Sequence, residues 1–170
     1  QATLHSLTNY THNLKDIVLE LNKRVIANTN SEKFVSLFIG KLNTKSQQLS
    51  YINAGHNSPL LFCDNKFTEL SKGCTLLGIT PNLIQIDVDT FDYASEFTLL
   101  CYTDGLTDTF NSNDDNLKPS DLMSLIENGD QSNPEKINES ILSYANEFKG
   151  ENEFPDDIAL LCLSVNDLSF

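Results

Sequence analysis

The chain of 170 residues has 39% hydrophobic residues, and no apolar run approaches the roughly 20 residues needed to cross a bilayer, so one globular domain is predicted. The charge is uneven, because residues 1–86 hold 8 basic and 5 acidic side chains, whereas residues 87–170 hold 3 and 19, for a formal net charge of −13 overall. This acidic second half argues against a nucleic-acid partner, since phosphate backbones require a basic face.

The N-terminal residues show no basic segment followed by an apolar run, so no signal peptide is visible and we expect a cytoplasmic protein. The four cysteines form no CxxC pair, which argues against a zinc site and favours reduced thiols. The sequence begins with Gln1 instead of methionine, which suggests a fragment, a processed chain or an excised domain.

In the first half of the chain, helix signals come first and short-strand signals follow. Residues 3–9 look like the end of a helix, and apolar residues at helical spacing predict an amphipathic helix over residues 13–27. Runs rich in β-branched and aromatic residues predict four short strands over residues 34–42, 49–53, 59–63 and 67–70. Because these strands follow one another closely, we expect an antiparallel meander, with an irregular segment after it over residues 73–81.

The second half combines strands with two helices. Alternating apolar residues predict a half-buried strand over residues 83–90, and a mostly apolar run predicts a buried strand over residues 97–102. Apolar stripes predict helices over about residues 119–128 and 134–148. A nearly continuous apolar run predicts a buried final strand over residues 158–165.

An Asp-Gly pair, Asp104 and Gly105, follows the strand predicted over residues 97–102. A carboxylate at a strand end is held rigidly yet stays open to a cleft, and a neighbouring glycine allows a ligand to approach the backbone closely. Mg²⁺ and Mn²⁺ prefer carboxylate, carbonyl and water oxygens, so the pair is a candidate metal site. The alternative is a plain turn, since both residues tolerate tight-turn backbone angles.

A second acidic pair, Asp156 and Asp157, immediately precedes the last predicted strand. Adjacent carboxylates at the mouth of an apolar strand are costly unless a cation offsets them. The alternative is a solvated acidic loop, as we expect for Asp114 and Asp115. If the two apolar strands are antiparallel neighbours, Asp104 and Asp156 lie at the same edge of a sheet and their carboxylates converge.

Five motifs occur in order along the chain: FVSLFIGKL, LSYINAGHNSPLLF, LLGITP, LLCYTDGLTD and PDDIALL. Together they resemble the bacterial branch of the metal-dependent PPM protein serine/threonine phosphatases, typified by the stage II sporulation protein E and by phosphatases that regulate alternative sigma factors. The resemblance extends over about residues 1–165. It implies a single α+β domain over residues 1–170, an antiparallel β-sandwich of two sheets flanked by helices, without its first strands.

The resemblance also implies a reaction, the hydrolysis of phosphoserine or phosphothreonine on a regulatory protein, with an anti-sigma-factor antagonist as the expected substrate. Two Mn²⁺ or Mg²⁺ ions would hold a bridging water that attacks phosphorus, since a divalent ion lowers the pKa of bound water. By motif, Asp104 and Asp156 would be metal ligands, Asp157 would support them, and Gly105 would allow close packing at the site. His56 of the NAGH motif would lie near the site, and a hydrogen-bonded structural role is favoured over acid–base catalysis.

Several features of the family are missing from the sequence. The family's early Gly-Asp pair has no counterpart, since Gly129-Asp130 falls in a polar link, and Asp108 stands where the family usually has glutamate. We therefore expect a domain that begins inside its first helix, binds divalent metal weakly and does not turn over substrate by itself. Unpaired sheet edges invite pairing with another chain, so we also expect a homodimer, strand exchange or a segment supplied by a partner.

Two further hypotheses stay open. A non-catalytic module of the same fold could bind a partner after losing its metal site. A generic acidic α+β domain could instead bind Ca²⁺ structurally, although no EF-hand spacing is present. In every case we expect no contact with nucleic acid or membrane from this segment.

Overall fold

The computed structural model describes residues 11–29, 32–94 and 96–166, which belong to two compact units. One unit comprises residues 1–56 and 71–92, and the other comprises residues 57–70 and 93–170. The helix end predicted over residues 3–9 lies outside the described residues. Among the described residues, none of the helices has both the length and the apolar character that a membrane span requires.

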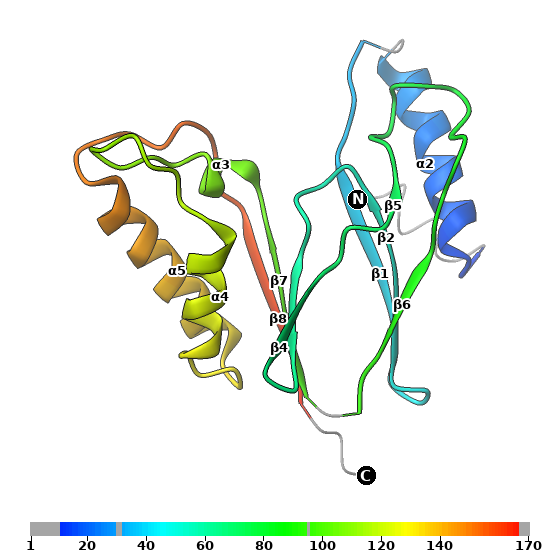
Figure 1. The fold of residues 1–170 in the computed structure, drawn as a ribbon. Helices are drawn as coiled ribbons and strands as arrows, with labels where there is room; N and C mark the ends of the chain where they lie inside the picture. The colour runs from blue at the N-terminus through cyan, green and yellow to red at the C-terminus, as the bar shows by residue number, and fades with distance from the viewer. Residues whose placement is uncertain (1–10, 30–31, 95, 167–170) are drawn as a thin grey trace. The chain divides into compact units, whose positions relative to one another are not determined.

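In the first unit, a helix covers a sheet built around a central strand. The strands are β1 (Leu37–Asn43), β2 (Gln48–Ala54), β5 (Gly73–Cys74) and β6 (Asp89–Asp92). The central strand β2 pairs antiparallel with β1 and β6 and parallel with β5. The helix α2 (Leu14–Thr29) runs along this sheet (Figure 1), and its Leu14 and Val18 share a buried cluster with Ile52 of β2.

A fully buried asparagine ties α2 to the loop that follows β5. The side-chain Nδ2 of Asn22 donates to the carbonyl of Thr80 at 2.9 Å, and its Oδ1 accepts from the amide of Gly78 at 2.8 Å. Gly78 has a φ of +95°, a left-handed conformation that favours glycine. The amide side chain therefore satisfies backbone groups that burial would otherwise leave unpaired.

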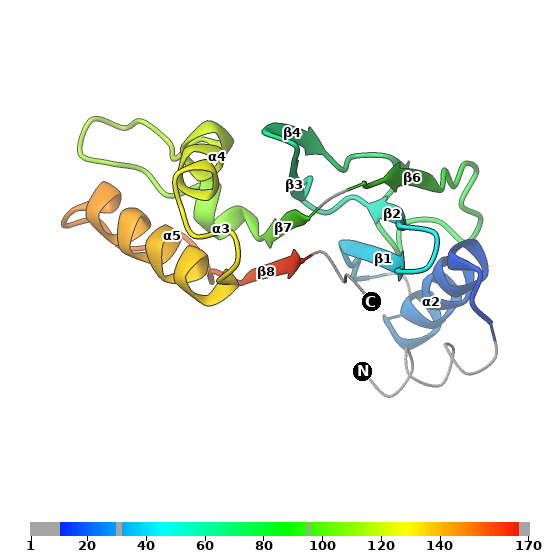
Figure 2. The same cartoon turned by 90° about the horizontal axis from the view of Figure 1, so that it is seen from below.

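The second unit contains a four-stranded antiparallel sheet in the order β4-β3-β7-β8. Its strands are β3 (Leu60–Cys63), β4 (Lys66–Glu69), β7 (Phe97–Tyr102) and β8 (Leu160–Val165). Two helices, α4 (Pro119–Glu127) and α5 (Pro134–Lys149), lie on the same side of this sheet (Figure 2). The core between them is formed by buried residues of both layers: Leu60, Phe62, Leu100, Tyr102, Leu122, Ile126, Ile137 and Ile141.

Both helices begin at a proline, which suits the first helical position because the missing N–H has no intrahelical partner there. Asn133 also caps α5, since its Oδ1 accepts from the amide of Lys136 at 3.2 Å. These local signals place the helices within a residue or two of the predicted positions.

The α+β class with antiparallel sheets is confirmed, but the predicted meander is wrong. Strands β2 and β3 belong to different sheets, because the chain leaves the first sheet at residues 55–59. The irregular segment over residues 73–81 contains the short strand β5, which pairs with β2 in place of a hairpin neighbour.

Two local predictions also differ from the structure. The strand predicted over residues 83–90 is wrong, because pairing begins only at Asp89 and Ile84 is 99% exposed. Ile86 nevertheless packs on the core. The segment before Asp89 is therefore an irregular stretch that contacts the core without forming a strand. Asp104 does not form a tight turn, since it opens the one-turn helix α3 (Asp104–Thr107), where the amide of Asp108 donates to its carbonyl at 2.7 Å.

Candidate functional site

The β7–β8 pair brings the two predicted acidic segments to one end of the second sheet. The strands pair antiparallel from Phe97 opposite Val165 to Tyr102 opposite Leu160. Asp104 follows the end of β7, and Asp156 precedes the start of β8. The antiparallel pairing expected from the sequence is therefore present, and both acidic segments lie at the same edge of the sheet.

Thr103 continues this pairing beyond the strands. Its amide donates to the carbonyl of Ala159 at 3.1 Å, and its Oγ1 accepts from the amide of Ala159 at 2.9 Å. The same hydroxyl donates to the carbonyl of Asp157 at 3.1 Å. Sequence reasoning did not single out Thr103, although its position in the YTDG motif, directly before Asp104, was an available signal.

Gly105 is buried where α3 meets the acidic segment. A Cβ at this position would lie 2.5 Å from the carbonyl oxygen of Asp157 and 3.0 Å from that of Asp156. Both are backbone atoms, so a larger residue would push the acidic segment away from α3. The glycine therefore permits α3 to pack closely against this segment, and its role in a functional site stays a prediction.

The carboxylates at this edge are exposed and are partly oriented by their own backbone. Asp104 Oδ1 accepts from the amide of Gly105 at 3.1 Å, and Asp156 Oδ1 accepts from the amide of Asp157 at 2.7 Å. Among the described residues, no lysine, arginine or histidine forms an ion pair with these three aspartates. The three carboxylates are therefore open to solvent and to ions from solution.

The donor chemistry of this edge fits a hard divalent cation. Mg²⁺ is commonly held by one or two carboxylates and keeps several waters, a number that Asp104 and Asp156 can supply. Over the described part of the chain, no group of three or more histidine, cysteine or acidic side chains is placed to hold a metal ion. The residues present would therefore hold such a cation weakly and would not enclose it.

The thiols of the same two strands do not offer a nucleophile. Burial raises the pKa of Cys101 to about 11, with a further contribution from the Cys162 charge. Burial likewise raises the pKa of Cys162 to about 11. Both thiols are protonated near neutral pH, and the thiolate is the nucleophilic form.

His56 belongs to the first unit, whereas Asp104, Gly105, Asp156 and Asp157 come together in the second. Its backbone amide donates to Asn53 Oδ1 at 2.8 Å, and its carbonyl accepts from Asn53 Nδ2 at 2.9 Å. The ring Nδ1 lies 3.5 Å from the Ser36 hydroxyl.

These contacts favour the structural interpretation of this histidine, whose role stays a prediction. Sequence reasoning overlooked Asn53, which is only 4% exposed and holds the turn through both ends of its amide. The signal for it was its place as the first residue of NAGH.

Known proteins with similar sequences belong to one phosphatase family. The sequence model of the stage II sporulation protein E (SpoIIE) family matches residues 1–166. Phosphoserine phosphatase RsbU of Bacillus subtilis (strain 168) is 29% identical over 115 residues, which cover 65% of this chain and 33% of that protein. The chain thus spans about a third of the curated relative that it matches.

Solved phosphatase structures share the fold. The PP2C phosphatase domain of SpoIIE from Bacillus subtilis, with a fragment of its regulatory domain, has a TM-score of 0.78 at 11% identity, covering 94% of this chain and 46% of that one. The catalytic domain of the serine/threonine protein phosphatase PstP, in complex with 2 manganese ions, has a TM-score of 0.67 at 13% identity, covering 96% and 76%. At these identities the likeness establishes the fold alone.

Proposed function

Since the chain belongs to the stage II sporulation protein E family, we propose that it is part of a metal-dependent phosphatase acting on phosphoserine or phosphothreonine of a regulatory protein. The expected substrate is a phosphorylated anti-sigma-factor antagonist, and the expected place of action is the cytoplasm. The sequence similarity to a phosphoserine phosphatase supports the reaction class.

The observation that supports this function best is the register at the end of the β7–β8 pair. Asp104 and Asp156 are far apart in the sequence, yet Tyr102 lies opposite Leu160 and Thr103 binds Ala159. The two carboxylates therefore belong to neighbouring backbone segments at one exposed edge. Such an arrangement suits a cation that must also contact a phosphate group from solvent.

In this proposal Asp104 and Asp156 are ligands of Mn²⁺ or Mg²⁺, and Asp157 supports them. A divalent cation bound there supplies positive charge that lowers the pKa of water and balances the charge of the phosphate. Gly105 keeps α3 against the acidic segment, and Thr103 fixes the backbone of that segment. His56 supports the turn that carries it.

A non-catalytic module of the same fold is the second candidate. It is favoured by one observation, that the described residues contain no group of three or more side chains placed to hold a metal. On that hypothesis the chain binds a partner, and the acidic edge has no catalytic role.

Metal titration separates the two candidates. Calorimetric titration of the chain with Mn²⁺ should show weak binding that Asp104→Asn and Asp156→Asn each weaken by about tenfold or more, since each removes a charged ligand. Asp115→Asn is the matched control, because this exposed aspartate of the polar loop after α3 accepts a hydrogen bond from Asn111 and is not one of the proposed ligands, so the change should leave binding unchanged. Equal effects of all three substitutions would contradict the proposed ligands.

Phosphatase activity is then measured on a longer protein that contains this chain, with a phosphoserine peptide and Mn²⁺. We expect phosphate release that Asp104→Asn abolishes and Asp115→Asn preserves. A longer protein that binds Mn²⁺ through these residues but releases no phosphate would favour the non-catalytic module. A robust rate of phosphate release from the 170-residue chain alone would contradict the expectation that this chain does not turn over substrate by itself.

Self-association through an open sheet edge is the proposed mode of oligomerisation. Among the described residues, β8 has a neighbour on one side only, and its Leu161 and Leu163 are 58% and 42% exposed. An apolar edge strand is a template for another strand. Sedimentation should show a dimer that Leu161→Lys weakens, and a compact wild-type monomer at high concentration would argue against this mode.

A further inference from the structure

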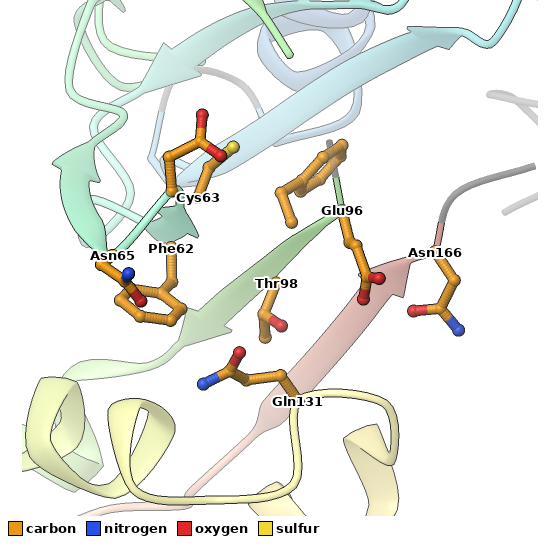
Figure 3. Close-up of a pocket in the computed structure, with 9 residues that line it drawn as sticks. Phe62, Cys63, Asn65, Glu96, Thr98, Gln131 and Asn166 are labelled. Carbon is orange, nitrogen blue, oxygen red and sulfur yellow. The ribbon is translucent and has the colours of Figure 1, made fainter. Parts of the chain in front are cut away.

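A concave site lies at the start of β7, at the opposite end of this strand from Asp104. A pocket of about 140 Å³ opens there within the second unit (Figure 3). Its lining includes an aromatic ring and several polar side chains: Phe62, Asn65, Glu96, Thr98, Gln131 and Asn166. Nothing in the proposed phosphatase chemistry uses these residues.

The sheet register explains why these side chains share one face. Phe62 lies opposite Thr98, and Thr98 lies opposite Ser164, so the three form one cross-strand row. Side chains alternate between the faces with a period of two, so Glu96 and Asn166 continue this face beyond the row. The polar residues are therefore placed on the side of the sheet that α4 and α5 cover further along.

Thr98 places a hydroxyl group in the lining of the pocket. The residue is only 3% exposed, and its side chain lines the pocket. Among the described residues, the structure shows no hydrogen bond to its hydroxyl. Among the described residues, Asn138 Oδ1 is the fully buried side-chain atom without a hydrogen-bond partner, so the Thr98 hydroxyl keeps access to the pocket, where a bound molecule or a water can pair with it.

Gln131 presents an acceptor on the opposite wall. Its Nε2 donates to the carbonyls of Ile126 and Glu127 at 3.4 and 3.2 Å, which leaves Oε1 to accept a hydrogen bond. Ser164 holds this loop in place by donating to the carbonyl of Gln131 at 2.6 Å. Figure 3 shows the amide of Gln131 directed toward Thr98.

Glu96 contributes a negative charge at the rim. Within the described part of the chain it forms no ion pair, and the pocket lining includes no lysine, arginine or histidine. A metal ion is a poor match, because no group of three or more metal-binding side chains is found among the described residues. A cation that carries its own hydrogen-bond donors matches the lining better.

We propose that this pocket binds a small organic molecule through a primary ammonium group. Such a group has three N–H donors, and the pocket offers three kinds of oxygen to receive them: the Glu96 carboxylate, the Gln131 amide and the Thr98 hydroxyl. The ring of Phe62 covers the carbon atoms of the ligand. The volume has room for several waters, or for an organic molecule of that size.

Ethanolammonium chloride is the probe, titrated into the ¹⁵N-labelled chain and followed by amide chemical shifts. Saturable shifts are expected at the backbone amides of Glu96, Thr98 and Gln131. Ethylene glycol, which is of similar size but uncharged, should cause none, and neither should MgCl₂ at matched ionic strength. Equal shifts with ethylene glycol, or shifts with MgCl₂ at the same residues, would overturn the proposal.

Two substitutions test the assigned groups. Glu96→Gln should weaken ethanolammonium binding by about tenfold or more, because the ammonium group then bonds to a neutral amide oxygen in place of a charged carboxylate. Thr98→Val, which keeps the side-chain shape, should weaken it several-fold, while Thr98→Ser retains binding. The control Glu139→Gln on α5 should bind like the wild type. Absence of saturable shifts, or unchanged affinity of Glu96→Gln, would refute the site without touching the proposed phosphatase function.

Discussion

Replacing Thr103 with valine removes one hydroxyl and changes the shape of the side chain little. That hydroxyl accepts from the amide of Ala159 at 2.9 Å and donates to the carbonyl of Asp157 at 3.1 Å. The substitution therefore removes both side-chain hydrogen bonds between Thr103 and the acidic segment, keeps the backbone bond from Thr103 to Ala159, and alters neither Asp104 nor Asp156. The variant therefore tests how much the position of the carboxylates matters when the carboxylates themselves are unchanged.

The structure sets the expected size of the effect. Two side-chain hydrogen bonds are lost, and each contributes about 0.5–1.5 kcal/mol net, so the free energy of unfolding should fall by about 2 kcal/mol. For a chain of this length that corresponds to roughly 4–8 °C in Tm. Because the carboxylates of Asp156 and Asp157 are then held less firmly, affinity for Mn²⁺ should fall as well, with the ligands themselves intact.

Chemical denaturation followed by circular dichroism measures the stability, and calorimetry measures the Mn²⁺ affinity. Thr103→Ser keeps the hydroxyl and should restore both quantities close to wild type. Thr107→Val is the neighbouring control, because it removes a hydroxyl of α3 that donates to the carbonyl of Asp104 at 3.3 Å and does not bond the acidic segment before β8 in the described part of the chain. A valine variant that matches the serine variant in both measurements would refute the idea that this hydroxyl organises the edge.

The remaining predictions concern packing, a buried polar contact and pH. Gly105→Ala should weaken Mn²⁺ binding and lower Tm, because its Cβ would lie 2.5 Å from the carbonyl of Asp157; an unperturbed Tm would contradict this close packing. Asn22→Ala should lower the free energy of unfolding by about 2–4 kcal/mol, since it leaves the buried amide of Gly78 and the partly buried carbonyl of Thr80 without this partner; urea denaturation checks this, and a loss under 1 kcal/mol, roughly the effect of a surface change, would count against it. Burial, together with the hydrogen bond to Asp89 and its charge, raises the pKa of Tyr51 to about 12. Its contribution to stability should thus be complete below about pH 10 and lost as the pH rises toward 12, with Tyr51→Phe abolishing that slope in pH-dependent denaturation. Burial alone would raise the pKa of Asp89, but hydrogen bonds from Tyr51 and Lys72 outweigh it and lower the pKa. The contribution of Asp89 to the free energy of unfolding is therefore present above about pH 4 and is lost as the pH falls below it. A free energy of unfolding that stays constant as the pH falls below about 4 would contradict the hydrogen bonds of Asp89 with Tyr51 and Lys72.

Local signals predicted much of the second unit. The apolar stripes and initial prolines of α4 and α5 specify helices through neighbouring residues alone, and the apolar runs of β7 and β8 specify buried strands in the same way. The alternation around Ile84 and Ile86 misled because it does not match burial in the structure: Ile86 packs on the core together with Leu83, three residues before it, whereas Ile84 is almost fully exposed. No local feature shows that the chain changes sheets at residues 55–59, so the meander was predicted in error.

For the candidate site, the sequence by itself determined which chemistry is available: carboxylates at the ends of two apolar strands, in motifs typical of one phosphatase family. Residue type and order along the chain carry that information, and folding does not change them. Only the tertiary structure decided that β7 and β8 are antiparallel neighbours, that Thr103 joins the two segments, and that Gly105 lies against the backbone of Asp157. These are contacts between residues more than 50 positions apart, and their geometry depends on strand register and packing that no short stretch of sequence encodes.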